Sequence, residues 1–270
     1  MSVLLVLGAS SDIGLALIES VIDKYDLIWA TYRTVNDRLD KLAAGYPDVI
    51  RTIRADLSAK EDISNLISTI RRDSEASTPS AYADISPDIT ASSDRRVSSC
   101  PDYGTASVPD HIVHIPMSPY SVTKFVKSDE DALESSMLLA LRSSVLPLQT
   151  FLPAMKKKGD GRVVFVLSSV TAGDPPAYQT AYTTVKYALL GLMKSLAAEY
   201  ADSGIRINAV SPDMINTKYI SGLSHLMIEQ YAASRPNGRL LDVSDVVPHI
   251  EHLLLDELSD KENGANVLIS

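Results

Sequence analysis

Two kinds of apolar pattern alternate along the chain. Short apolar runs predict strands buried on both faces, as in a parallel sheet. Between these runs, apolar residues recur at helical spacing, for example Ile13, Leu17 and Val21. The alternation is typical of βαβ units and predicts an α/β fold. The predicted strands cover residues 3–7, 27–30, 49–55, 111–115, 162–167, 205–210 and 265–269, and the later predicted helices cover residues 39–44, 60–72, 129–155, 178–200 and 243–255.

The pattern is interrupted between residues 73 and 109, where Ser, Pro, Asp and Ala dominate without a sustained apolar period. Structureless stretches longer than about 15 residues are uncommon inside compact domains. We therefore predict a surface insertion here, which is either disordered or carries an element that binds a partner. Since neither an internal repeat nor a domain linker is evident, the sequence predicts one doubly wound domain over residues 1–270.

Composition excludes several classes of protein. The 25 basic and 34 acidic residues give a net charge of −9, which argues against a nucleic-acid partner bound through its phosphates. No apolar run approaches the roughly 18 residues needed to cross a bilayer, and residues 1–7 lack the basic region of a signal peptide. A single cysteine, Cys100, leaves no internal disulfide or cysteine zinc cluster, and we predict no metal site. These features favour a cytoplasmic globular protein without membrane contact.

The first predicted strand runs into a turn that contains Gly8 and Gly14. In a dinucleotide-binding turn, the first glycine lets the chain turn sharply and the last allows helix and strand to pack closely. The helix N-terminus then offers N–H groups and a positive dipole end to a pyrophosphate. Asp12 stands where a further glycine would help a phosphate approach, and its alternative role is helix N-cap. This turn alone fits either a dinucleotide site or an ordinary βα connection.

Tyr182 and Lys186 are four residues apart on a predicted helix, so their side chains share one face. A lysine ammonium beside a phenol lowers the pKa of the phenol. A tyrosine tuned in this way can pass a proton to or from a substrate oxygen. Ser169 follows a predicted buried strand and is placed to hydrogen-bond the same oxygen. The alternative is a solvated Tyr–Lys pair on an amphipathic helix.

A second set of residues, Ser107, Tyr120 and Lys124, has the same spacing as the first. Ser107 follows no predicted strand, and no helical apolar face surrounds Tyr120. We therefore favour Ser169, Tyr182 and Lys186 as the catalytic residues.

Taken in order, these motifs resemble those of the short-chain dehydrogenase/reductase family over nearly the whole chain apart from the insertion. The resemblance implies a single-domain Rossmann fold, with a doubly wound parallel sheet of about seven strands, and hydride transfer between a nicotinamide and a carbonyl or alcohol carbon. It also implies that Tyr182 is the acid/base, that Lys186 holds the nicotinamide ribose, and that Ser169 orients the substrate oxygen. The segments that carry the resemblance are residues 8–14, Asp56-Leu57, 161–169, 182–186, 207–212 with Thr217, and 236–239.

The same resemblance implies a set of residues that contact the cofactor. They come from the glycine-rich turn, the ends of the second, third and fourth strands, the Tyr–Lys helix and the segment that closes over the nicotinamide. The residues are Gly8, Ser10, Ser11, Asp12, Ile13, Gly14, Arg33, Asp56, Leu57, His114, Tyr182, Lys186, Pro212, Ile215 and Thr217.

Two positions depart from the family pattern. The family's Asn-Asn-Ala-Gly is replaced by His114-Ile115-Pro116-Met117, and Pro116 has no backbone N–H to offer a cofactor. The helix-borne asparagine of the catalytic tetrad falls at Ala140, so its proton relay is absent or re-routed through water. These departures keep two alternatives open: a cofactor-binding redox sensor or scaffold with little turnover, and an epimerase or dehydratase that uses the same cofactor.

The end of the second predicted strand bears on the choice of cofactor. It reads Thr31-Tyr32-Arg33 and lacks the carboxylate that holds the ribose 2′-hydroxyl of NAD. Arg33 can instead pair with a 2′-phosphate through a charge-assisted contact, unless it is simply a surface arginine. We predict NADP(H) in preference to NAD(H).

The partners expected from the sequence are a small-molecule substrate and further copies of the chain. Tyr219, Leu223, Leu226 and Met227 follow the Pro212 segment and indicate a partly apolar carbonyl or alcohol, unless they pack in the core. The resemblance implies a homodimer or homotetramer built on the long helices at 129–155 and 178–200.

Overall fold

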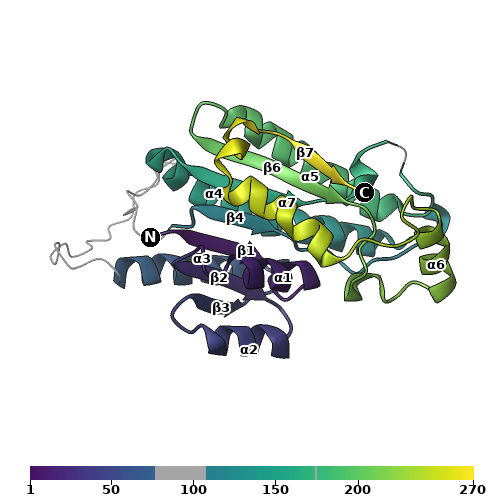
Figure 1. Cartoon of the computed structure of the whole chain (residues 1–270), viewed down its shortest axis with the longest axis horizontal. Helices are drawn as coiled ribbons and strands as arrows, with labels where there is room; N and C mark the ends of the chain where they lie inside the picture. Colours follow the sequence, from purple (N-terminus) through teal and green to yellow (C-terminus); the bar gives the residue numbers. More distant parts are fainter. Residues whose placement is uncertain (77–107, 174) are drawn as a thin grey trace, which may run out of the picture.

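A computed structural model describes residues 1–76, 108–173 and 175–270, so most of the predicted insertion lies outside the described residues. The described strands form one parallel sheet in the order β3-β2-β1-β4-β5-β6-β7, which confirms the predicted fold class (Figure 1). All the predicted strands are present, with small shifts at their ends. They are β1 (Val3–Leu7), β2 (Leu27–Tyr32), β3 (Ile50–Arg54), β4 (His111–His114), β5 (Gly161–Val166), β6 (Ile205–Pro212) and β7 (Asn266–Ile269).

The helices agree with the sequence pattern except for one. The helix α6 (His225–Ala233) was not predicted: it is short, none of its residues is fully buried, and its apolar stripe of Ile228, Tyr231 and Ala232 is only half-buried. The other helices are α1 (Asp12–Val21), α2 (Asp37–Gly45), α3 (Lys60–Ala76), α4 (Glu130–Lys158), α5 (Thr180–Glu199) and α7 (Val243–Leu255).

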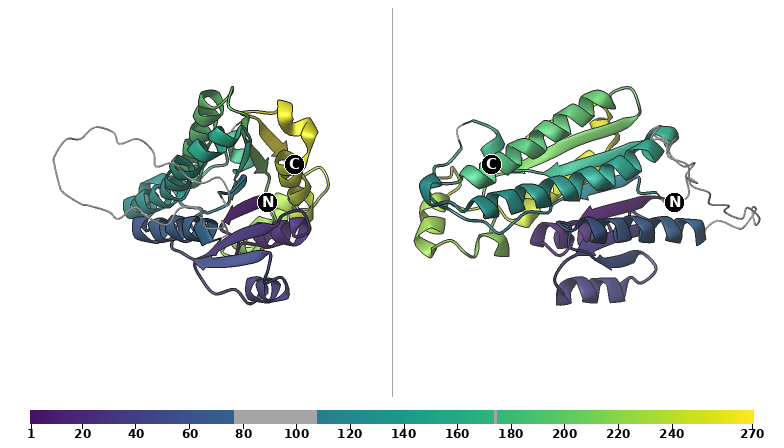
Figure 2. Two further views of the ribbon diagram at one scale, coloured as in Figure 1. Left: turned by 90° about the vertical axis from the view of Figure 1, so that its left-hand side faces the viewer. Right: turned by 180° about the vertical axis from the view of Figure 1, so that it is seen from behind.

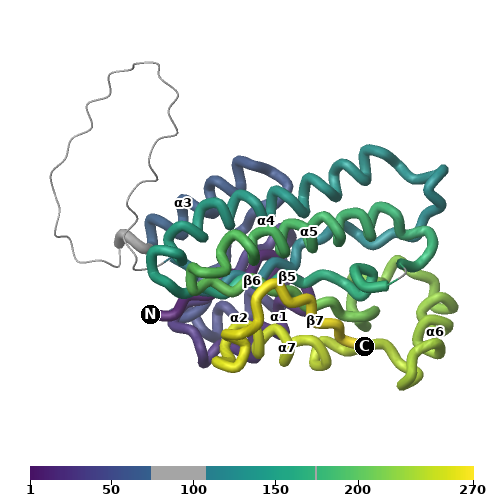
Figure 3. Tube along the Cα trace, turned by 90° about the horizontal axis from the view of Figure 1, so that it is seen from above, coloured from purple at the N-terminus to yellow at the C-terminus, as the bar shows by residue number. Residues whose placement is uncertain are grey.

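Helices cover both faces of the sheet, which explains why its strands are apolar runs without alternation. In β1, Val3, Leu5 and Leu7 belong to a core shared with α3, α4 and α5, whereas Leu4 and Val6 belong to a core shared with α1 and α7. Figures 2 and 3 show the two helical layers, with α3, α4 and α5 on one side and α1, α2 and α7 on the other.

The strand order places a topological switch point between β1 and β4. From β1 the chain builds outward to β2 and β3, and it then returns to build β4 on the other side of β1. In open α/β sheets, ligands bind in the crevice outside the carboxyl ends of the strands at such a point. The helix α6 and the loops around it lie beyond this carboxyl edge (Figure 1).

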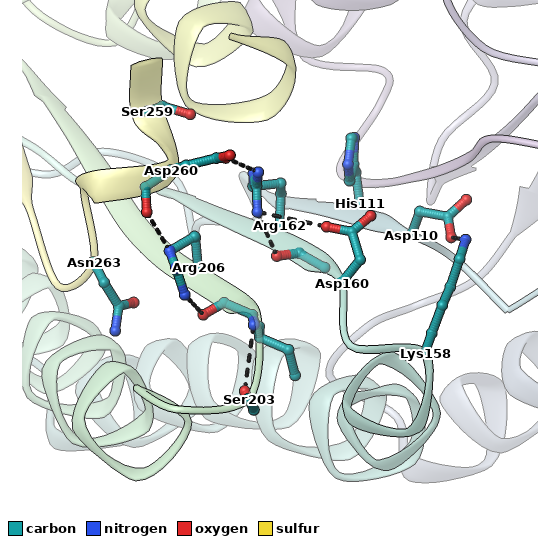
Figure 4. Close-up of polar contacts among 12 residues, drawn as sticks. Asp110, His111, Lys158, Asp160, Arg162, Ser203, Arg206, Ser259, Asp260 and Asn263 are labelled. Atoms are coloured by element: carbon teal, nitrogen blue, oxygen red, sulfur yellow. Dashed lines mark hydrogen bonds and ion pairs between the residues drawn. The ribbon is translucent and has the colours of Figure 1, made fainter. Parts of the chain in front are cut away.

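The opposite, amino edge of the sheet carries a network of charged side chains (Figure 4). Lys158 pairs with the buried carboxylate of Asp110, which also accepts the backbone N–H of Val3 at 2.8 Å. Arg162 at the start of β5 pairs with Asp260. These contacts join the ends of separate strands and helices, so they stabilise the edge that lies away from the switch point.

His111 begins β4 within the same edge. Its Nδ1 lies 2.5 Å from the hydroxyl of Tyr25, and the two rings meet edge to face. Burial lowers the pKa of His111 to about 4, even though Asp110 and Asp160 favour its charged form. The imidazole is therefore neutral at physiological pH.

Among the described residues, α4 alone is long and apolar enough to cross a membrane, judged by length and composition. The helix continues through Pro147 and Pro153. Its buried residues, among them Leu148 and Phe151, pack in the core beneath the sheet. The apolar character of α4 is thus that of a core helix.

Candidate active site

A cavity of about 500 Å³ opens at the carboxyl edge, where the switch point predicts a ligand site. Its wall comes from segments far apart in the sequence, and it contains fourteen of the predicted site residues: Gly8, Ser10, Ser11, Asp12, Ile13, Arg33, Asp56, Leu57, Ser169, Tyr182, Lys186, Pro212, Ile215 and Thr217. In the part of the chain that the structure describes, no group of three or more His, Cys, Asp or Glu side chains is placed to hold a metal ion.

The glycine-rich turn disfavours a side chain at Gly8 through its backbone conformation and at Gly14 through lack of space. Gly8 has a φ of 83°, a conformation that favours glycine. A Cβ added at Gly14 would lie 2.8 Å from Ala9 Cα, from the carbonyl oxygen of Ala9 and from that of Gly8. All three contacts are with backbone atoms, which cannot rotate away. The turn therefore has the close helix–strand packing that a dinucleotide site requires.

Replacing Gly14 by alanine is expected to lower the free energy of unfolding by about 1–3 kcal/mol, because the backbone of the turn must shift. Urea unfolding measures this loss. Gly191→Ala on α5 is the matched control, since nothing lies within 4 Å of an added Cβ there. That substitution should be neutral or stabilising by up to about 1 kcal/mol. Equal stability of Gly14→Ala and the wild type would contradict the packing argument.

Ser11, rather than Asp12, caps α1, which corrects the alternative role considered for Asp12. The Ser11 hydroxyl accepts the N–H of Gly14 at 3.1 Å and donates to the carbonyl of Gly8 at 2.8 Å. The Asp12 carboxylate instead accepts the backbone N–H of Lys218 at 2.8 Å. Asp12 thus ties the glycine turn to the loop that follows β6.

Tyr182 and Lys186 lie on consecutive turns of α5, as the sequence predicts. The Lys186 Nζ is buried, donates to the carbonyl of Val166 at 2.9 Å, and lies 5.6 Å from the centre of the Tyr182 ring. Burial lowers the pKa of Lys186 to about 7. The pair has the predicted spacing, but the amine points to the end of β5 rather than to the phenol oxygen.

The pKa of Tyr182 is raised to about 12, whereas the sequence analysis expected Lys186 to lower it. Burial is the largest cause; a hydrogen bond with Ser168 opposes it, and Tyr120 adds to it. The expectation failed because burial disfavours the charged form of both partners, the phenolate and the ammonium. Tyr182 is therefore a protonated phenol, which can donate a hydrogen bond to a substrate oxygen.

Ser169 faces a buried carboxylate that the sequence analysis missed. The Ser169 hydroxyl donates to Oδ1 of Asp213 at 3.1 Å, the Tyr231 hydroxyl donates to the same oxygen, and Arg235 Nη1 donates to Oδ2 at 2.7 Å. Burial raises the pKa of Asp213, but the hydrogen bonds from Tyr231 and Arg235 outweigh burial and hold it below its ordinary value. A carboxylate directly after Pro212, at the end of a buried strand, was the signal available in the sequence.

Three tyrosine rings line the cavity together. The ring of Tyr120 meets that of Tyr182 edge to face at 5.2 Å between centroids and lies 5.7 Å from that of Tyr219. The Tyr219 hydroxyl donates to the carbonyl of Ser118 at 3.0 Å. Tyr120 is thus part of the wall around Tyr182 rather than the centre of a second site. Ser107, from the same alternative set, lies outside the described residues.

Comparisons with known proteins decide the family. A family model described as enoyl-(acyl carrier protein) reductase matches residues 110–269, more than half of the chain. The chain belongs to the short-chain dehydrogenase/reductase family. Two relatives from Salmonella typhimurium are oxidoreductase UcpA, 38% identical over 128 residues (43% of this chain and 48% of the relative), and 3-oxoacyl-[acyl-carrier-protein] reductase FabG, 34% identical over 137 residues (50% and 54%). The matched part of the chain spans about half the length of these relatives.

Solved structures of short-chain dehydrogenases/reductases share the fold along nearly the whole chain. Levodione reductase has a TM-score of 0.80 at 18% identity and covers 100% of this chain and 96% of its own. ElxO with NADP bound has a TM-score of 0.77 at 18% identity, with coverages of 99% and 96%. The 3-ketoacyl-(acyl-carrier-protein) reductase from Brucella melitensis, complexed with NADH, has a TM-score of 0.78 at 17% identity, again covering 99% and 96%.

The segment that departs from the family's Asn-Asn-Ala-Gly builds the cavity wall differently from expectation. His114 does not line the cavity: it is buried, and its Nε2 lies 2.7 Å from the hydroxyl of Ser143 on α4. Burial lowers the pKa of His114 to about 3, and Lys186 adds to this effect. The wall is formed by Ile115, Pro116 and Met117 instead.

Ala140, where the resemblance leads us to expect the tetrad asparagine, is buried in α4 of this short-chain dehydrogenase/reductase. Its carbonyl accepts hydrogen bonds from the hydroxyls of Ser143 at 3.2 Å and Ser144 at 2.8 Å. The side chain therefore supplies no polar group at this point.

The far end of the cavity holds Arg33 and Asp56. Asp56 accepts hydrogen bonds from the hydroxyl and the N–H of Ser58, which lower its pKa, and the charge of Arg33 lowers it further. Asn36, which the sequence analysis did not single out, caps α2 and donates to the carbonyl of Ser10 at 2.9 Å. This part of the cavity therefore presents the guanidinium of Arg33 to a ligand, and β2 contributes no carboxylate beside it.

Proposed function

We propose that this protein transfers a hydride between NADP(H) and a carbonyl or alcohol substrate. The observation that carries the proposal is that one cavity is lined by Tyr182, Lys186 and Ser169 together with the glycine-rich turn. The backbone packing at Gly14 fits a dinucleotide, since close approach of this kind is the role of the last glycine in such turns. A bound nicotinamide supplies or accepts the hydride.

Three residues of the chain have separate roles in the proposed reaction. Tyr182 is a protonated phenol and gives its proton to the carbonyl oxygen during reduction, taking it back from the alcohol during oxidation. Lys186, buried one turn further along α5, holds the ribose of the nicotinamide. Ser169 positions the substrate oxygen opposite Tyr182. The aromatic wall of Tyr120 and Tyr219 favours a substrate that is partly apolar.

A screen of carbonyl compounds, followed by the absorbance of NADPH, tests the proposal. We expect at least one compound to consume NADPH in the presence of the wild-type protein and not with Tyr182→Phe. The buried Ala140, which carries no asparagine amide, favours a second candidate: a protein that binds the cofactor with little turnover, such as a redox sensor. Tight binding of NADPH without consumption by any carbonyl compound would favour that candidate.

NADPH is expected to bind more tightly than NADH, because Arg33 lines the cavity and no carboxylate follows β2. A charge-assisted contact to the 2′-phosphate contributes on the order of 1.5–3 kcal/mol. Calorimetric titration of both cofactors measures the preference, and Arg33→Ala should remove it. Arg51→Ala, an exposed arginine on β3, is the control that should keep it. Equal affinity of the wild type for both cofactors would exclude NADP(H) selectivity.

We further propose a cytoplasmic homodimer or homotetramer that associates through α4 and α5. Leu138 on α4 and Tyr187 on α5 are large apolar or aromatic side chains that remain exposed in the single chain. Sedimentation velocity is expected to show a dimer or tetramer, and a monomer at micromolar concentration would contradict this proposal.

A further inference from the structure

Asp213 occupies an unusual place for a charged residue. It lies at the end of β6 and is 7% exposed, and its carboxylate receives hydrogen bonds from groups on both sides of the cavity. Ser169 donates from the end of β5, whereas Tyr231 and Arg235 donate from α6 and the turn after it. One carboxylate thus connects the serine of the site to the helix beyond the carboxyl edge.

The contact with Asp213 determines what Ser169 can do for a substrate. An ionised carboxylate only accepts hydrogen bonds, and a serine hydroxyl has a single hydrogen to donate. With that hydrogen directed to Asp213, Ser169 presents only its lone pairs to the cavity. Of these two side chains, the protonated Tyr182 is then the donor and Ser169 the acceptor. A substrate hydroxyl can donate to Ser169, whereas a substrate carbonyl can accept from Tyr182 but not from Ser169.

The other two donors to Asp213, Tyr231 and Arg235, connect it to α6 and the turn after it. None of the nine residues of this helix is buried, and Leu226 and Met227 are 62% and 42% exposed. Its apolar contact with the fold is limited to a half-buried stripe of Ile228, Tyr231 and Ala232. Tyr231 and Arg235 also contact each other, with the guanidinium 4.5 Å from the centre of the ring. Their hydrogen bonds to the buried carboxylate connect α6 and the turn after it to the end of β6.

We propose that Asp213 is a positioning residue that orients the hydroxyl of Ser169 as an acceptor and holds α6 over the cavity. The part that concerns Ser169 rests on the proposed function. The part that concerns α6 depends only on the hydrogen bonds of Tyr231 and Arg235.

Hydrogen exchange of the α6 amides in the NADPH-loaded protein tests the hold on the helix. In Asp213→Asn, the amide NH₂ must face either Ser169 and Tyr231 or Arg235, so at least one donor loses its partner. We expect amide exchange in α6 to become about tenfold faster or more in Asp213→Asn and Tyr231→Phe, since a hydrogen bond to a charged group is lost. Ser169→Ala should leave this exchange unchanged. Asp202→Asn and Tyr46→Phe, both exposed and outside the cavity, are the matched controls.

A double-mutant cycle tests the action on Ser169 in the oxidation direction, with NADP+ and the alcohol that corresponds to the carbonyl substrate of the NADPH screen, because a substrate hydroxyl can donate to Ser169. Ser169→Ala and Asp213→Asn should each lower kcat/KM, and Asp213→Asn should cost about tenfold less in the Ser169→Ala background than alone. Tyr231→Phe keeps the contact between Ser169 and Asp213, so it should couple weakly to Ser169→Ala. A residue that only supports the fold would give losses that multiply.

Two results would overturn the proposal. One is an amide exchange rate in α6 that is the same in Asp213→Asn as in the wild type. The other is a double-mutant cycle in which the losses of kcat/KM caused by Ser169→Ala and Asp213→Asn are independent of each other. If the wild type consumes NADPH with no carbonyl compound, the proposed function and the role assigned to Ser169 fail together. Faster exchange in Asp213→Asn and Tyr231→Phe would then still support the hold on α6, so the two failures are distinguishable.

Discussion

Replacing Tyr182 by phenylalanine is expected to lower kcat by about 10²–10⁴-fold, the usual contribution of a positioned acid or base. The change removes only the hydroxyl, so the ring keeps its edge-to-face contact with Tyr120 and α5 keeps its packing. Cofactor affinity should therefore stay close to that of the wild type. Steady-state kinetics with the substrate from the screen and calorimetric titration of NADPH measure the two quantities.

Two further variants separate this role from its neighbours. Lys186→Ala should weaken cofactor binding as well as kcat, because Lys186 is proposed to hold the ribose. Tyr120→Phe should do little, since its ring still packs against Tyr182. Full activity of Tyr182→Phe together with loss of activity in Tyr120→Phe would place the acid on the other tyrosine of the same wall.

Acidification from pH 6 to pH 5 is expected to lower the free energy of unfolding by about 2.5 kcal/mol. His111 and His114 have folded-state pKa values of about 4 and about 3, against an ordinary value of 6.5. Below pH 6.5 the unfolded chain binds two protons that the folded chain does not, so stability falls until the folded-state pKa values are reached. Urea unfolding at a series of pH values measures the slope.

The assignment of this slope can be checked residue by residue. His114→Leu should roughly halve it, and Ser143 keeps a partner there because it also donates to the carbonyl of Ala140. His225→Gln is the matched control, since that side chain is 88% exposed. The pKa of Lys186 is about 7 in the folded chain against an ordinary value of 10.5. Its protonation therefore makes stability depend on pH only between pH 7 and pH 10.5, which is outside the window from pH 6 to pH 5. A free energy of unfolding that stays constant between pH 6 and pH 5 would show that the buried imidazoles are already charged.

The sequence predicts the sheet well and the edges of the site poorly, for physical reasons. Strands such as β1 are buried on both faces, and burial imposes an apolar run that is visible in one dimension. α6 is short and its apolar stripe is only half-buried, and polar contacts to Asp213 add to its attachment, so the periodic pattern that marks it is weak. Its position depends on residues that are distant in sequence.

The sequence likewise predicts some features of the site and misses others. The spacing of Tyr182 and Lys186 is local to one helix and could be read directly, but their pKa values depend on burial by other segments. Tyr120 was set aside because its own surroundings lack a helix, yet the fold brings it against Tyr182. The place of His114 at the end of β4 predicts a contact with the cofactor, but its side chain lies against Ser143 instead. Side-chain direction is not contained in the linear pattern.

The two ends of the sheet suggest a practical use for this chain. The helix α3 ends at Ala76 and β4 begins at His111, so the chain leaves and re-enters the described structure at the amino edge, opposite the cavity (Figure 1). A circularly permuted fluorescent protein spliced between these points would sit at the far side of the molecule from Tyr182. Such a fusion would label the chain without placing the added domain beside the cavity.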